Sequence, residues 1–179
     1  MPLLVLTVLL AASAPAPSAA VQTPAPATVA CDVQLKVADP DPKGLNVRAG
    51  PSATAPIVGV LKPDGDWTWV HATGQGGDWI AIDRAETIDD DAPNGSRAVY
   101  AKTGWVHVGK LGISELQTGN GTVLRDRPAA DARVVKRIGA QDTAPVRVLG
   151  CHGKFIEVRT GRLRGWTDRW CNNERTTCS

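Results

Sequence analysis

The sequence predicts an all-β protein that contains two copies of one small fold. A segment of the chain occurs twice, since Val47-Arg48 recurs as Leu124-Arg125 and Pro51 recurs at the same spacing as Pro128. Many short segments alternate apolar and polar residues, which is typical of half-buried strands. Glycine and proline punctuate these segments, and no stretch keeps a helical period. A repeat of this length indicates two small barrels or sandwiches rather than one large enzyme core.

Residues 1–30 are expected to lie outside this fold. Residues 3–12 form an apolar run that is too short to span a bilayer, and small residues follow at 18–20. Residues 1–20 are therefore predicted to be a secretory signal peptide, cut after Ala20. A retained membrane anchor is the alternative, because no Lys or Arg precedes the apolar run. Residues 21–30 are rich in proline and alanine and are predicted to be an extended tether.

The strand signals of the first copy follow in order after the tether. VQLKV alternates apolar and polar residues, and LNVRAGPS is a strand that runs into a turn. The residue before Pro51 in this turn needs a permissive backbone, and glycine, at position 50, provides it. Further segments are IVGVL (57–61), WIAI (79–82) and TGWV (103–106).

This series of segments, from about residue 45 to 111, resembles the bacterial Src-homology-3-like (SH3-like, or SH3b) domain family. The second copy is divergent. It has VLRDRP at 123–128 and RGW at 164–166, but it lacks the asparagine and the Gly-Pro pair, and Thr167 stands where the family has an apolar residue. The resemblance implies a five-stranded barrel in each copy, export from a bacterium to the periplasm or beyond, and a binding role.

The repeat also predicts the domain boundaries. The first SH3-like domain (copy one) is expected at 31–116, and the divergent second domain (copy two) at 117–179 with a disulfide-bonded tail. The spacing between equivalent residues is smaller for Trp105 and Trp166 than for Trp79 and Phe155, so copy one holds an insertion between its last two strands. This acidic insertion, at about 84–100, is expected to be a solvated loop.

The net charge of +2 conceals an asymmetry between the copies. Residues 31–116 hold 8 Lys and Arg against 12 Asp and Glu, whereas residues 117–179 hold 12 against 6. Electrostatic docking of the two copies on each other is the favoured explanation, and contact of the basic copy with an anionic surface is the alternative. Nucleic acid is not expected as the partner of an exported protein, and no transmembrane segment is expected after signal removal.

Four cysteines in an exported chain are expected to form two disulfides. If the register of the last hairpin continues beyond its strands, Cys171 lies opposite a residue close to Cys151. The prediction is therefore Cys151–Cys171, which leaves Cys31–Cys178. A bond between Cys171 and Cys178 within the tail is the main competitor.

Aromatic residues are the main candidates for a binding surface. Trp67 and Trp69 are two residues apart on a strand and so share a face. Val146 and Val148, near the corresponding positions of copy two, favour a buried location for this face; if it is exposed, it is a platform for sugar rings or a peptide. Trp79 adds to the aromatic character of copy one.

Two further residues complete the candidate binding set, and two tryptophans are left out of it. Tyr100 is the single tyrosine, so a proline-motif groove lined by tyrosines is not expected. Arg48 follows an inward apolar residue and should face outward, either on a neighbouring tryptophan or against a ligand. Trp105 and Trp166 are expected to be buried and structural.

Catalytic and metal-binding patterns have little support. The three histidines and the acidic residues do not show a metal-ligand spacing, and oxidised cysteines would leave no thiolate nucleophile. No catalytic residue, metal or cofactor is predicted. The expected function is non-catalytic binding of a cell-wall glycan or stem peptide, or of an envelope protein. The alternatives are a secreted inhibitor or adaptor of an envelope enzyme and, less favoured, a small envelope hydrolase.

Overall fold

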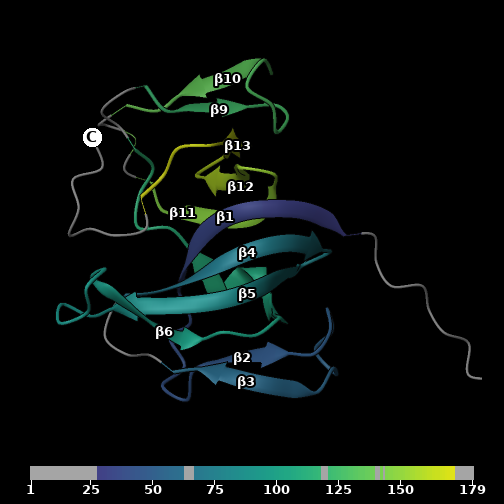
Figure 1. Cartoon of the computed structure of the whole chain (residues 1–179). Helices are drawn as coiled ribbons and strands as arrows, with labels where there is room; N and C mark the ends of the chain where they lie inside the picture. The colour runs from purple at the N-terminus through teal and green to yellow at the C-terminus, as the bar shows by residue number, and fades with distance from the viewer. Residues whose placement is uncertain (1–27, 63–66, 118–120, 140–141, 143, 172–179) are drawn as a thin grey trace, which may run out of the picture.

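The protein consists of β-strands joined by short turns (Figure 1). The structure is a computed structural model that describes residues 28–62, 67–117, 121–139, 142 and 144–171. Within these residues the one helical element is a short 3-10 turn, Val108–Lys110, which confirms the prediction of an all-β chain. The predicted signal peptide, most of the tether and Cys178 lie outside the described residues.

Copy one forms the larger sheet. Its strands are β1 (Val29–Val37), β2 (Leu45–Arg48), β3 (Ile57–Leu61), β4 (Thr68–Gly76), β5 (Trp79–Ile88), β6 (Ser96–Tyr100), β7 (Gly104–His107) and β8 (Leu111–Gly112). They are hydrogen-bonded in the order β3-β2-β7-β5-β4-β1-β8, and β6 pairs with β5 beside this path. All the pairs are antiparallel.

Copy two forms the smaller sheet. Its strands are β9 (Val123–Arg125), β10 (Val134–Arg137), β11 (Val146–His152), β12 (Phe155–Thr160) and β13 (Leu163–Thr167). Their order is β10-β9-β13-β12-β11, which is the order β3-β2-β7-β5-β4 of copy one. The two sheets therefore share one order of five strands, at the positions of the repeated segments. The hydrogen-bonded strands do not close either sheet into a barrel, so the closed SH3-like barrel stays a prediction.

Equivalent side chains make equivalent contacts in the two copies. Arg48 Nη1 donates a hydrogen bond to the carbonyl oxygen of Ala55 over 2.7 Å. Arg125 Nη1 donates to the carbonyl oxygen of Ala132 over 2.8 Å, one repeat further along the chain. This shared bond fixes the turn between the first two strands of each repeat and gives the outward arginine of each copy a structural role.

Glycine determines the tight hairpins. Three two-residue turns begin with Gly77, Gly153 and Gly161, whose φ angles of 60°, 54° and 57° are in the left-handed region. A glycine at the first turn position and an ordinary residue at the second is the preference of a type II′ turn, whose twist matches the flanking strands. Gly77 and Gly153 have the same spacing as the repeated residues Trp79 and Phe155. They fix the equivalence of the β4–β5 and β11–β12 hairpins.

The acidic insertion is a hairpin rather than a loop. Strand β5 continues to Ile88, and β6 returns beside it with Thr87 opposite Arg97. The acidic residues at 89–91 lie in the turn, where Asp89 accepts a hydrogen bond from the Asp91 backbone at 3.1 Å. The prediction of a solvated loop was wrong because the apolar and polar residues of this segment alternate in burial along β5.

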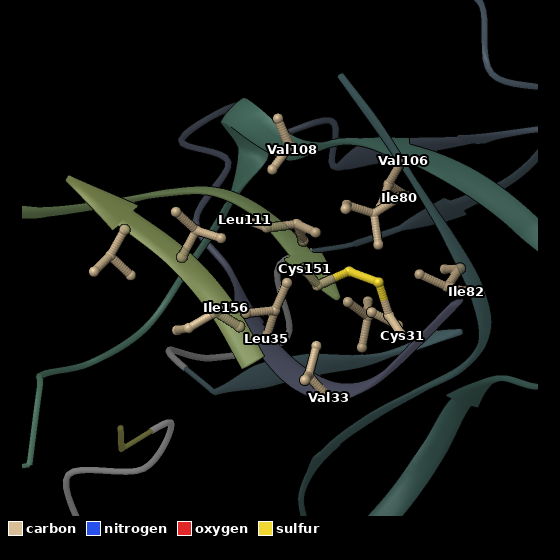
Figure 2. Close-up of a cluster of buried hydrophobic side chains, with 14 of the residues drawn as sticks. Cys31, Val33, Leu35, Ile80, Ile82, Val106, Val108, Leu111, Cys151 and Ile156 are labelled. Atoms are coloured by element: carbon tan, nitrogen blue, oxygen red, sulfur yellow. A yellow bond between two sulfur atoms is a disulfide. The ribbon is translucent and has the colours of Figure 1, made fainter. Parts of the chain in front are cut away.

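A continuous core joins the two sheets. Alternate residues along the strands are buried, such as Val47, Ile80 and Ile82 in copy one and Val148 and Ile156 in copy two. These residues belong to one hydrophobic cluster that crosses the junction between the copies (Figure 2). The junction is therefore packed as an interior.

Strand β1 is the main link between the copies. Its beginning pairs with copy two, since the Asp32 amide donates to the Gly153 carbonyl at 2.8 Å and the Gly153 amide donates to the Ala30 carbonyl at 2.7 Å. From β4, the Gln75 side chain reaches across and accepts a hydrogen bond from the Cys151 amide at 2.7 Å. Strand β1 also pairs with β4 along its length, so it belongs to both halves of the molecule.

A disulfide at this junction corrects the predicted cysteine pairing. Cys31 is bonded to Cys151, with both side chains in the core (Figure 2). Cys171 is also disulfide-bonded, so the predicted Cys151–Cys171 and Cys31–Cys178 pairs are wrong. The extrapolated register failed because the β12–β13 ladder ends at Thr167. The competing prediction, a bond between Cys171 and Cys178, involves Cys178, which lies outside the described residues.

The faces of the tryptophans also differ from expectation. Thr68 and Val70 are buried and Trp67 and Trp69 are half-exposed, so the favoured buried location for this tryptophan pair was wrong. The prediction of a buried pair was based on aligning Val146 and Val148 of copy two with these tryptophans, and that alignment was wrong. Superposing the hairpin glycines of the two copies aligns Val146 with Val70 rather than with a tryptophan.

Trp105 and Trp166 lie on the outer face as well. Each is half-exposed and stands between two buried neighbours on its strand. In each Gly-Trp pair the glycine, Gly104 or Gly165, is the buried residue. A Cβ atom on Gly104 would clash with the Val47 side chain, and a Cβ atom on Gly165 would lie 2.9 Å from Leu124 Cβ. The expectation that both tryptophans are buried was therefore wrong, and the glycine is the residue that allows close packing.

We expect the Cys31–Cys151 bond to be a major contributor to stability. The bond spans 120 residues of sequence, and closing a loop of that size lowers the entropy of the unfolded chain by an amount equivalent to about 4–5 kcal/mol. A Cys31→Ser/Cys151→Ser double variant should lose stability of this order in denaturant unfolding. Peptide mapping without reduction should join Cys31 to Cys151, and a Cys151–Cys171 peptide would contradict the structure.

Candidate functional site

The most complete candidate site is a groove on the outer face of copy one. It is a cavity of about 210 Å³, and its polar and aromatic lining comprises Asp39, Asp41, Asn46, Arg48, Trp79, His107 and Lys110. Two of the predicted binding residues, Arg48 and Trp79, are thus brought together. They come from β2 and β5, which are separated in the sheet by β7.

The strand register positions the aromatic side of the groove. Trp79 lies opposite His107 on the neighbouring strand β7. Their rings meet edge to face, with centroids 5.4 Å apart and planes at 86°. The next residue along the chain from each, Ile80 and Val108, is buried, so both rings stay on the outer side. This contact restrains the Trp79 ring, and a restrained aromatic ring loses little conformational entropy when a ligand stacks on it.

The charges of the groove are partly neutralised within it. Lys110 Nζ is 2.9 Å from Asp39 Oδ1, and the Asp39 side chain is only 7 % exposed. Asp41 is exposed and accepts a hydrogen bond from the Lys43 amide at 2.9 Å. The lining of the groove therefore includes both an exposed carboxylate, Asp41, and the Arg48 guanidinium. Positively and negatively charged side chains next to an aromatic ring suit a polar ligand that also has an apolar ring face.

Trp67 and Trp69 lie on a different part of the outer surface. Lys36 Nζ is 4.3 Å from the centroid of the Trp67 ring, so a cation covers one face of that ring. Trp69 is placed between Lys36 on β1 and Glu86 on β5. The Trp170 indole, unassigned from the sequence, donates to the Gln34 carbonyl at 3.1 Å on the same strand β1. These tryptophans do not line the groove.

Tyr100 is half-buried and packs against the core. Its hydroxyl donates to the Thr103 carbonyl at 3.1 Å, and burial raises the pKa of the phenol. The ring lies against Gly59, where an added Cβ would be 2.7 Å from it, and its hydroxyl is close to Gly104. Tyr100 thus fills the space between β3 and the start of β7, and the structure does not bring it into the groove.

Sequence reasoning missed His107 and the outward position of Trp105. Trp105 lies between Arg48 and Ala81 in the register, next to the groove. The alternation of residues along β7 could have predicted these positions, since an inward Val106 requires Trp105 and His107 to face outward. In copy two the corresponding row is Arg125, Trp166 and Glu157, so the arginine–tryptophan pair is repeated and the third position is not.

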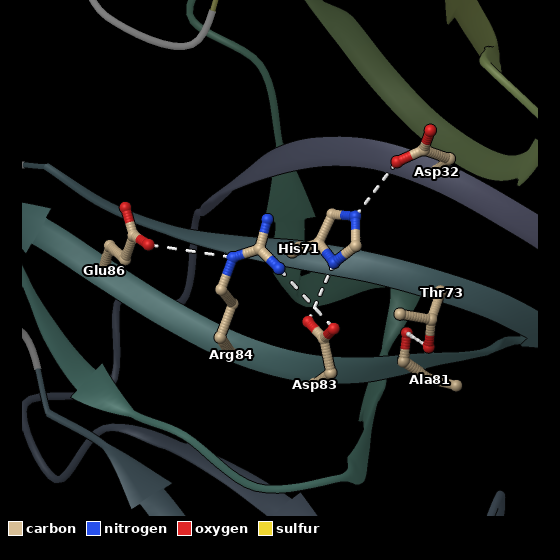
Figure 3. Close-up of polar contacts among 7 residues, drawn as sticks. All are labelled: Asp32, His71, Thr73, Ala81, Asp83, Arg84 and Glu86. Atoms are coloured by element: carbon tan, nitrogen blue, oxygen red, sulfur yellow. Dashed lines mark hydrogen bonds and ion pairs between the residues drawn. The ribbon is translucent and has the colours of Figure 1, made fainter.

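A second polar cluster is centred on His71 of β4 (Figure 3). Its Nδ1 atom is 2.8 Å from Asp83 Oδ1, and its Nε2 atom is 3.1 Å from Asp32 Oδ1. Each ring nitrogen is thus within hydrogen-bond distance of a carboxylate oxygen. The hydrogen bond from His71 lowers the pKa of the Asp32 carboxyl.

The position of this cluster indicates a structural role. Asp32 is on β1 next to Cys31, and Asp83 is on β5, so the imidazole joins the strands on either side of β4. With both ring nitrogens engaged, neither is directed at an open space where a substrate could bind. No group of His, Cys, Asp and Glu side chains able to hold a metal ion occurs within the described residues.

We expect the Asp32–His71 contact to make stability depend on pH in the acid range. Because the pKa of Asp32 is lower in the folded protein than in the unfolded chain, its contribution is present above the ordinary carboxyl range and is lost as the pH falls through the lowered value. The difference in Tm between the wild type and Asp32→Asn should be larger at about pH 5 than at about pH 2. Exposed Asp168, changed to Asn, is the control. An equal difference at both pH values would remove this role.

The comparisons with known proteins leave the site to be interpreted from its own geometry. No protein-family model matches the chain, and neither a curated protein nor a solved structure gives a match. The part of the chain that the structure describes includes no helix able to cross a bilayer.

Proposed function

We propose that this protein is an exported, non-catalytic binding protein that recognises a component of the bacterial cell envelope. The favoured ligand is a cell-wall glycan or stem peptide, and an envelope protein is the alternative partner. The observation that carries the proposal is the groove in which Trp79, restrained by His107, stands beside the polar side chains of Arg48, Asn46 and Asp41. The buried disulfide fits an oxidising compartment, as expected outside the cytoplasm.

The chemistry of the groove favours a sugar or a short peptide. A sugar ring has an apolar face that stacks on indole and hydroxyls at its edge that need donors and acceptors. Arg48 and Asn46 supply donors, and Asp41 supplies an acceptor. A stem peptide, which carries amides and charged ends, is recognised by the same set of groups. The volume of about 210 Å³ accommodates a small unit of a polymer that extends along the open surface.

We further propose that each copy is an SH3-like barrel. The support is the common order of five strands in both sheets, together with the equivalent Arg48 and Arg125 hydrogen bonds. A further support is that the segments LNVR, IVGVL and GWVH of copy one are each β-strands. The domain boundaries near residues 116 and 117 are part of this proposal.

The alternative of an inhibitor or adaptor has one feature in its favour. The β5–β6 hairpin presents the exposed acidic residues Asp90 and Asp91 at its turn, which is a suitable contact for a basic surface on an enzyme. A hydrolase would need a carboxylate or imidazole directed at a bound substrate. The His71 cluster, whose ring nitrogens are both engaged by carboxylates, does not favour that function.

We expect Trp79→Ala to weaken binding of the full-length, oxidised protein to purified sacculi by about tenfold or more, as loss of an aromatic anchor does. Co-sedimentation across a range of sacculus concentrations gives the apparent affinity. Trp67→Ala is the matched control, because it removes a half-exposed tryptophan that lies outside the groove.

The salt response separates stacking from charge contacts. Aromatic contacts persist in high salt whereas exposed charge contacts are screened, so wild-type binding should weaken only in part between low and high salt. Equal affinities for the wild type and Trp79→Ala would rule out the groove. If the wild type fails to co-sediment at any salt concentration, wall binding is wrong and the inhibitor or adaptor function takes precedence.

A further inference from the structure

Three arginines form a row across the outer face of copy two. Arg147 on β11 lies directly opposite Arg159 on β12, and Arg159 lies directly opposite Arg164 on β13. All three side chains are exposed. These strands are adjacent in the smaller sheet (Figure 1). Directly opposed residues have Cβ atoms about 5 Å apart, so the row concentrates positive charge on neighbouring strands.

One arginine of the row is neutralised and two are not. Arg164 forms a two-pronged ion pair with Glu157, with Nε–Oε1 and Nη2–Oε2 distances of 2.7 and 2.8 Å. Neither Arg147 nor Arg159 has a hydrogen-bond or ion-pair partner for its guanidinium within the described residues. Like charges placed opposite each other destabilise a sheet. The fold therefore carries an uncompensated pair whose repulsion an anion would relieve.

Docking of the basic copy on the acidic copy does not account for this pair. The junction between the copies is formed by the Cys31–Cys151 bond, by backbone hydrogen bonds at Gly153 and by Gln75. Arg147 and Arg159 take no part in these contacts. The favoured explanation of the charge asymmetry thus leaves these two arginines unexplained, and contact with an external anion is the explanation that accounts for them.

The two arginines also line a cavity. Its volume is about 510 Å³, and its walls are formed by Pro145, Val146, Arg147, Arg159 and Gly161. Gly161 begins the type II′ turn between β12 and β13 and has no side chain to fill the space. None of these wall residues carries a carboxylate. Pro145 and Val146 provide an apolar margin beside the two guanidiniums.

We propose that Arg147 and Arg159 form a binding site for a phosphate group, either free or carried by a polymer. Each guanidinium offers paired N–H donors in a fixed plane that matches the oxygens of a phosphate, and two guanidiniums match the double negative charge of the free ion or the charges of two neighbouring phosphates in a polymer. A carboxylate has fewer oxygens and one charge, so it fits the pair less well. This site is on a different copy and a different sheet from the Trp79 groove, so it does not depend on the proposed envelope function.

The test measures thermal unfolding of the full-length, oxidised protein with added sodium phosphate, sodium acetate or sodium chloride at matched ionic strength. Phosphate should raise the Tm of the wild type more than acetate or chloride does. Arg147→Gln and Arg159→Gln should each abolish that extra rise. Without phosphate and at low salt, both variants should have a Tm at or above the wild-type value, because the repulsion is removed.

Arg137→Gln is the matched control. It removes the same charge from an exposed position on β10, which is separated from β12 by two strands. This variant should keep the phosphate response of the wild type. Loss of the response in Arg137→Gln as well would show a general charge effect and overturn the site, as would an equal rise with acetate or no rise with phosphate.

A second arm identifies the source of the phosphate group. Long-chain polyphosphate replaces sodium phosphate in a titration followed by intrinsic tryptophan fluorescence. If a polymer is the ligand, polyphosphate should bind at least about tenfold more tightly per phosphate than sodium phosphate, with an affinity that falls steeply with salt. Equal affinity per phosphate would assign the site to a free phosphate ion. Unchanged polyphosphate binding by both Arg→Gln variants would contradict the site in either form.

Discussion

The arrangement of the two copies depends on strand β1. Along its length it completes the sheet of copy one beside β4, and at its beginning it is hydrogen-bonded and covalently joined to copy two. The Cys31–Cys151 bond is buried in the shared core, so oxidation and hydrophobic packing stabilise the same junction. The His71 cluster fastens β1 to β4 and β5 immediately beside this point, because Asp32 follows Cys31 in the strand.

Local features of the fold could be predicted from the sequence, and contacts between the copies could not. Alternation and repeat spacing are properties of short segments, so they indicate strands that the structure confirms, including LNVR and WIAI. The Cys31–Cys151 pair depends on how β1 crosses to β11, and no local pattern encodes that crossing. The insertion is mistaken for a loop because its acidic turn hides the alternation that precedes it in β5.

The candidate site shows the same division. Arg48 and Trp79 could be named from residue type and from their place in the repeat, but their meeting in one groove depends on β7 lying between β2 and β5. The outward position of Trp105 was available from the alternation with Val106. The row of arginines was not, since Arg147 and Arg159 become neighbours only when the β11–β12 register is known.

The position of the disulfide constrains the order in which the molecule can mature. A chain that emerges from its N-terminus delivers Cys31 before copy one and Cys151 after all of it, because the two cysteines have a sequence separation of 120. Any part of the copy-one sheet that assembles as the chain emerges therefore does so while the Cys31 thiol still lacks its partner. During that interval the Cys31 thiol has no native partner and can exchange with other thiols. The native bond can form only after all of copy one and part of copy two have been delivered, however fast either sheet folds.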